Sequence, residues 1–206
     1  MLTGCITYQH PATGEDALAA QKKLAVVPSG YLAMTATFDL ASFFGLPQIE
    51  LDVQPVGGGD VVHLQVGAAE IEAFGPRVAE IPLIFVLPAG RYEVVKSQIR
   101  IPGGRMGRRE YSDMTQILNL ERHYQPFTVD ADRLTHIGIT YFSLTESHSG
   151  HTLFYQTRTN TWLSRPKAAT WAPYRALIGR VPATFSHKLK NGTVEWAPFT
   201  NGKDAL

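Results

Sequence analysis

The chain has 206 residues, of which 44% are hydrophobic and 18% charged, so it can bury one sizeable core and is not a disordered chain. No run approaches the roughly 20 apolar residues that span a bilayer, and the single cysteine excludes an intrachain disulfide and a multi-cysteine metal site. Residues 1–90 carry three basic and nine acidic side chains, net −6, whereas residues 91–206 carry sixteen basic and nine acidic, net +7.

The first 30 residues are predicted to be an N-terminal tether with one short helix. Residues 6–14 combine proline, glycine and short polar side chains without periodicity. Residues 15–26 place acids first and lysines later, with alanine and leucine between them, an order that suits the helix dipole. The alternative is that 15–26 continues the tether.

Residues 31–206 are predicted to form a single, mainly β domain. Short stretches there alternate apolar and polar side chains or are rich in β-branched residues. The predicted strands are residues 31–38, 49–56, 60–66, 81–87, 91–101, 116–121, 125–130, 136–145 and 152–158. Their number and spacing are typical of an antiparallel β-sandwich. Strict alternation through 91–101 would put Tyr92, Val94, Lys96 and Gln98 on one face, and Ser97, Ile99 and Ile101 on the other.

Alternation weakens beyond about residue 159, where an irregular C-terminal extension is expected. A short helix at 172–180 and a final hairpin within 184–199, turning at Asn191-Gly192, are predicted there. No linker divides the chain into two folding units, and no internal repeat is present.

The stretch FVLPAGRYEVV, residues 85–95, is an apolar strand, a Pro-x-Gly turn and an aromatic-led strand. It resembles a hairpin of transthyretin-like or carboxypeptidase-regulatory-like β-sandwich domains. The resemblance implies a sandwich fold and no particular activity.

Leu2-Thr3-Gly4-Cys5 resembles the lipobox of bacterial lipoproteins: Leu, a small residue, Gly or Ala, then Cys. The resemblance implies cleavage before Cys5, a diacylglycerol on its thiol and a fatty chain on its new amine. Each CH₂ group of these chains that is buried in the membrane contributes about 0.8 kcal/mol to the free energy of anchoring. Ile6 after the cysteine implies the outer membrane, with the body facing the periplasm. A basic start and an apolar run of about 7–15 residues would have to be encoded upstream of Met1. The alternative is a small buried or fraying cysteine in a cytoplasmic protein.

The basic second half carries the strongest binding signal. Between Ser147 and Val194 there is no Asp or Glu, while seven basic residues and several aromatics occur there, and a second cluster comprises Arg100, Arg105, Arg108 and Arg109. Basic groups attract phosphate or carboxylate polymers, and flat aromatics stack on sugars or bases. The predicted contacts are Arg105, Arg108, Arg109, Trp162, Arg165, Lys167, Trp171 and Arg175. The alternative is that these charges spread over the surface or pair with the acidic first half, and that the tryptophans are core.

Two further kinds of site are compatible with the sequence. Glu146, His148 and His151 lie within a predicted loop at 146–151 and are suitable zinc ligands, which would make the protein a metal-dependent enzyme. No further ligand is identifiable, and a solvated hairpin loop is the other interpretation. A carbohydrate-binding module would require Trp162, Trp171 or Trp196 to form an exposed platform. No Gly-x-Ser-x-Gly elbow is present, and the glycine-rich stretches 56–59 and 103–107 are interpreted as turns.

The sequence therefore predicts a non-enzymatic, lipid-anchored envelope protein that uses no cofactor. Its expected partner is an envelope protein or an anionic envelope polymer, not nucleic acid. The opposite charges of the two halves are also compatible with a homo-oligomer formed by head-to-tail association.

Overall fold

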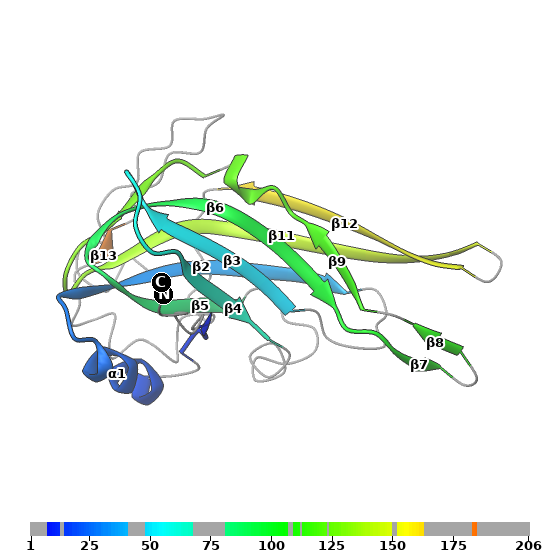
Figure 1. Cartoon of the computed structure of the whole chain (residues 1–206), viewed down its shortest axis with the longest axis horizontal. Helices are drawn as coiled ribbons and strands as arrows, with labels where there is room; N and C mark the ends of the chain where they lie inside the picture. Colours follow the sequence, from blue (N-terminus) through cyan, green and yellow to red (C-terminus); the bar gives the residue numbers. More distant parts are fainter. Residues whose placement is uncertain are drawn as a thin grey trace, which may run out of the picture.

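The structure is a computed structural model of the whole chain. It describes residues 8–12, 15–40, 48–67, 81–106, 109–111, 113–122, 124–149, 152–162 and 183–184. Over these residues the protein is mainly β, with two larger sheets, one two-stranded sheet and one α-helix (Figure 1).

The first sheet, sheet A, is built around a long central strand, β6 (Gly90–Ile101). Its strand order is β1 (Tyr8–Gln9), β4 (Val62–Val66), β3 (Gln48–Pro55), β6 and β10 (Phe127–Val129), with β9 (Met114–Ile117) also pairing with β6. Its pairings are antiparallel except that of β1 with β4. The second sheet, sheet B, has the order β12 (Thr152–Trp162), β11 (Leu134–Ser149), β2 (Ser29–Leu40) and β5 (Ile81–Pro88).

Sheet B departs from the expected antiparallel pattern in its middle. β2 and β11 run parallel, as do β11 and the short β13 (Ala183–Thr184). The outer pairs, β11 with β12 and β2 with β5, are antiparallel. The sheets are therefore mostly antiparallel, and the parallel pairing joins strands about a hundred residues apart, which no local pattern encodes.

One apolar core is shared by the two sheets. Its buried side chains come from both of them, and examples are Leu32, Leu51, Leu64, Phe85 and Ile99. The other face of sheet B packs on α1 (Glu15–Leu24), where Leu18 meets Ile84 and Val86. β5 is thus buried on both faces, which explains why its sequence is a nearly continuous apolar run rather than an alternating one.

Strict alternation through 91–101 is wrong, because β6 contains a β-bulge. The register with β3 shifts between Asp52 and Val53, which leaves Val95 as an extra, 38% exposed residue. The extra residue reverses the phase of alternation, so both halves of the strand bury apolar groups. The buried residues of β6 are Tyr92, Val94, Ser97, Ile99 and Ile101.

The strand expected at 116–121 is shorter than its sequence pattern indicates. β9 ends at Ile117, Asn119 has a φ of 57°, and a 3-10 helix, η1, covers Leu120–Arg122. A left-handed backbone at Asn119 cannot continue a strand. Conversely, the stretch 103–107, interpreted from the sequence as a turn, contains β7 (Gly104–Met106), which pairs with β8 (Arg109–Tyr111).

The described part of the expected tether lies against the sheets. Tyr8–Gln9 pairs with β4, and the N–H of Ala12 donates to the carbonyl of Ile84 at 2.8 Å. Ala12 is 1% exposed. Small side chains permit this close approach, so a stretch without periodicity still packs. The helix expected at 172–180 lies outside the described residues, and of the hairpin expected at 184–199 only Thr184, the end of β13, is described.

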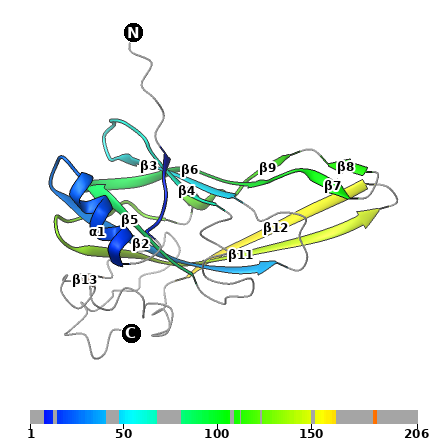
Figure 2. The ribbon, with the colours of Figure 1, turned by 90° about the horizontal axis from the view of Figure 1, so that it is seen from below.

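Two hairpins extend from the same end of the molecule. The β7–β8 hairpin and the far end of the β11–β12 hairpin lie at the end opposite α1 in both views (Figures 1 and 2). The predicted arginine cluster belongs to this end, which therefore becomes the first candidate site.

Candidate functional site

The arginine end, defined as Arg100, Arg105 and Arg109, begins where β6 leaves sheet A. Arg100 is the penultimate residue of β6, and its guanidinium donates to Asp113 Oδ2. Asp113 Oδ1 accepts the N–H of Gly103 at 2.7 Å. Both side chains are about half exposed. Asp113 therefore closes the turn between β6 and β9 with two charge-assisted hydrogen bonds.

This pairing shifts the pKa of both groups. Hydrogen bonding to Arg100 and to the Gly103 N–H lowers the pKa of the Asp113 carboxyl, and hydrogen bonding to Asp113 raises the pKa of Arg100. The sequence pattern placed Arg100 in a cluster of four arginines. In the structure Asp113 neutralises it, so the net charge of this end rests on the hairpin beyond it.

The β7–β8 hairpin holds the other two arginines of this end. Arg105 pairs in register with Glu110, and Met106 with Arg109. Arg108 lies outside the described residues. Residues 104–111 contain three arginines and one glutamate, net +2. A short hairpin that projects from the sheets therefore carries a positive charge excess.

The remaining predicted contacts are not brought to the arginine end by the described structure. Trp162 is the last residue of β12 and pairs with Ile139, ten residues along the strand from Thr152 at the hairpin tip. At about 3.3 Å per residue this is roughly 33 Å. Cys5, Arg165, Lys167, Trp171 and Arg175 lie outside the described residues, as does Trp196.

The expected loop at 146–151 is mostly strand. Glu146 and His148 belong to β11 and pair in register with Tyr155 and Leu153, while His151 lies outside the described residues. The loop is shorter than expected because β11 and β12 continue pairing to Ser149 and Thr152. Among the described residues, no group of three or more His, Cys, Asp or Glu side chains could hold a metal ion.

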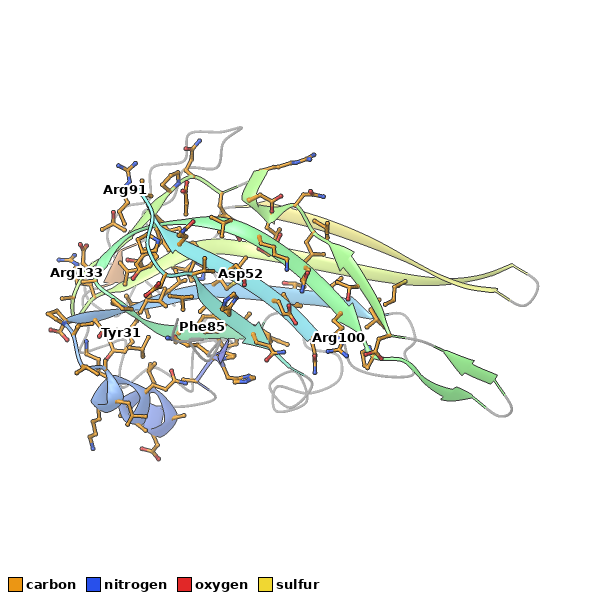
Figure 3. All side chains as sticks on the ribbon, viewed as in Figure 1. Tyr31, Asp52, Phe85, Arg91, Arg100 and Arg133 are labelled. Carbon is orange, nitrogen blue, oxygen red and sulfur yellow. The ribbon has the colours of Figure 1, made fainter. Side chains whose placement is uncertain are left out.

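A polar face on sheet A was not singled out from the sequence. His63 Nδ1 and Asp52 Oδ1 are 2.8 Å apart on register partners of β3 and β4, and Gln98 of β6 donates to Glu50 of β3. Asp52 is labelled on β3 in Figure 3. These side chains alternate with the buried ones of the same strands. The stretches on either side of the glycine-rich turn at 56–59 both alternate apolar and polar side chains, which predicts two paired strands. That pattern could have placed Asp52 beside His63 on neighbouring strands.

Buried polar groups of sheet B bond to one another. His136 is 1% exposed, its Nδ1 accepts the N–H of Gly138 at 3.0 Å, and its Nε2 lies 3.0 Å from Thr35 Oγ1. Because Nδ1 accepts a hydrogen bond, the neutral ring carries its proton on Nε2 and donates it to Thr35. His136 borders a bulge, because the β11–β2 register shifts between His136 and Ile139, where Gly138 has a φ of 108°. The contacts link β11 to β2, which is a structural role.

A cavity of about 620 Å³ lies where the C-terminal end of α1 meets the end of β5. Its lining residues are Gln9, His10, Gln21, Leu24, Ala25, Val26, Val27, Ser29, Val86, Leu87 and Pro88. The volume is in the range of small-molecule and peptide sites, and the lining is mostly apolar with a few polar groups. Sequence reasoning missed this site because its walls come from three separate segments.

Comparisons with known proteins identify no relative of this chain. No protein-family model, no curated protein and no solved structure matches the sequence or the fold.

No helix among the described residues is long and apolar enough to cross a membrane.

Proposed function

We propose that this protein is a non-enzymatic binding protein of the bacterial envelope, which recognises an anionic partner protein or polymer through the arginine end. In this proposal the two sheets form a β-sandwich around their shared core. Cys5 carries a lipid anchor, and the body faces the periplasm from the outer membrane.

The observation that supports this function is the projecting hairpin with its excess of arginines. A guanidinium offers a planar fork of N–H donors that matches phosphate and carboxylate oxygens. Arg105 and Arg109 lie on β7 and β8, beyond the Arg100–Asp113 pair that closes the end of β6. In this proposal the hairpin attracts an anionic partner through its net positive charge, and the attraction should weaken as the salt concentration rises because salt screens charges.

Reversing the charge of the hairpin tests the arginine end. The double variant Arg108→Glu/Arg109→Glu is expected to reduce retention on isolated outer-membrane vesicles about tenfold at about 50 mM salt, with the difference largely gone at about 500 mM. Co-sedimentation of the purified protein with the vesicles measures this.

The matched control is Arg91→Glu, which lies on the same strand β6 as Arg100 but at the opposite end (Figure 3). Arg91 is exposed, so its replacement should leave both folding and retention unchanged. Equal retention of the double variant and the unchanged protein at low salt would contradict the proposal. If Arg91→Glu lowers retention to the same extent, the effect comes from the overall charge of the protein and not from the arginine end.

The proposed anchor has its own test. Intact mass spectrometry of protein extracted from its native host should find the chain starting at Cys5, with a mass increase equal to a diacylglycerol and one fatty acyl chain. A free thiol at Cys5 on a chain recovered from the cytoplasm would exclude the anchor and the envelope location.

A further inference from the structure

The turn that leads from α1 to β2 presents apolar side chains to solvent. Leu24 is 80% exposed, Val26 98% and Val27 54%. Pro28 is also exposed, and its carbonyl accepts the N–H of Ala89, an exposed residue of the turn between β5 and β6, at 2.8 Å. These five residues form the apolar rim. Exposed, contiguous apolar groups of this kind are typical of a surface that another molecule covers.

The sequence around the apolar rim carries positive charge and no negative charge. Residues 17–38 contain no Asp or Glu, and their two basic residues, Lys22 and Lys23, come directly before Leu24. They are two of the three basic residues in the acidic half of the chain, residues 1–90. Lys23 is exposed, whereas Lys22 lies 3.0 Å from Asp132. Lysines beside exposed aliphatic groups suit a bilayer interface, where the ammonium groups meet anionic headgroups.

The apolar rim lies close to the segment that would carry the lipid anchor. Gln21, one turn before Leu24 on α1, donates from Nε2 to the carbonyl of His10 at 3.1 Å. Cys5 is five residues before His10, a span of at most about 18 Å in a fully extended chain. A lipid on Cys5 would therefore keep the apolar rim within reach of the membrane surface.

The arginine end lies at the opposite end of the molecule (Figures 1 and 2). β6 begins at Gly90, next to Ala89 of the apolar rim, and reaches Arg100 ten residues later. At about 3.3 Å per residue this is roughly 33 Å along the strand, several times the Debye length of about 10 Å. A membrane at the apolar rim would therefore leave the arginine end directed away from the bilayer.

Resting on the envelope location proposed above, we propose that the apolar rim inserts into the interface of a lipid bilayer and orients the protein on it. Leu24, Val26 and Val27 then reach the boundary between headgroups and acyl chains, and Lys23 contacts anionic headgroups. A lipid attached at one point does not by itself orient the body, whereas a second point of contact does. The arginine end is thereby presented to the periplasm.

A bilayer fits these observations better than a second protein molecule. Lysine is depleted in protein–protein interfaces, where aromatic residues and arginine are enriched. Residues 17–30 contain two lysines and no aromatic residue or arginine. Aliphatic side chains bordered by lysine are instead typical of segments that lie in a membrane interface.

The test places the full chain on lipid nanodiscs of phosphatidylethanolamine and phosphatidylglycerol. An N-terminal histidine tag on a nickel-chelating lipid holds the chain there whether or not Cys5 is lipidated in the native protein. Failure of the proposed anchor and failure of the rim insertion are therefore distinguishable. Methyl NMR signals are compared between nanodiscs with and without a lipid that carries a doxyl group on its acyl chain. The methyl signals of Leu24, Val26 and Val27 are expected to lose at least about five times more intensity than that of Ile117.

Ile117 is the matched control within the chain, because it is an aliphatic residue of β9 that is 64% exposed outside the apolar rim. Val26→Asp puts a charge in the rim and should lower the intensity loss at Leu24 to the level of Ile117. A second variant, Ile117→Asp, makes the same kind of change on β9 and should leave the loss at Leu24 unchanged. Both positions are exposed, so folding should survive both changes.

Three outcomes would overturn the proposal. The first is equal loss of intensity at the rim methyl groups and at Ile117, and the second is an unchanged loss at Leu24 in Val26→Asp. The third is a concentration-dependent shift of the rim methyl signals in lipid-free solution without selective loss on nanodiscs. That result would assign the apolar rim to a second copy of the chain.

Discussion

Replacing Gly30 with alanine is expected to cost about 3 kcal/mol or more, a large share of the roughly 5–15 kcal/mol that stabilises a domain of this kind. A Cβ at this position of β2 would lie 2.0 Å from the carbonyl oxygen of Asp130, 2.9 Å from Val129 Cγ1 and 3.0 Å from Asp130 C. Two of these atoms are backbone, so no rotamer change relieves the clash. The strands would have to separate where β2 passes the end of β10.

Urea unfolding followed by tryptophan fluorescence and circular dichroism measures this loss. The matched control is Gly90→Ala at the start of β6, where the nearest atom to the new Cβ is Tyr92 Cε2 at 3.4 Å, an ordinary contact. This change should shift stability by less than about 1 kcal/mol. If Gly30→Ala proves as stable as Gly90→Ala, the close passage of Gly30 and Asp130 is incorrect.

The second large effect is expected at Phe85, among the largest fully buried side chains of the described core. Phe85 is 1% exposed on β5, and its side chain belongs to the core cluster that both sheets share. Removing its ring in Phe85→Ala should cost about 3–5 kcal/mol, since the lost transfer free energy is increased by the cavity left behind. Because β5 is an edge strand held between the core and α1, this loss should weaken both contacts.

Two comparisons make the Phe85 prediction specific. Phe85→Leu keeps most of the apolar volume and should cost about 1.5 kcal/mol or less. Val95→Ala truncates the exposed bulge residue of β6 and should stay within about 0.5 kcal/mol of the unchanged protein. A cost below about 1 kcal/mol for Phe85→Ala would show that the two sheets do not share a core at this position.

The candidate sites differ in how far the sequence could predict them. The arginines of residues 100–109 are close in the chain, so their grouping was predictable from the sequence. The neutralisation of Arg100 by Asp113 was not, because it required the pairing of β6 with β9. The cavity beside Val86 was not predictable, because residues 9–10, 21–29 and 86–88 meet only in the folded chain. Trp162 was grouped with the arginines because aromatic and basic residues both occur in the second half of the chain. Its strand register instead places it away from the hairpin tip.

The sequence by itself determined that the chain is mainly β and where most of its strands lie, since these properties follow from the local order of apolar and polar side chains. That β5 is buried on both faces was decided by the packing of α1 on sheet B. Only the tertiary structure decided the parallel pairing of β2 with β11, the bulge at Val95 and the docking of Ala12 on β5. Each of these depends on which distant strand is the neighbour, and that choice is set by the packing of the whole core rather than by any local pattern.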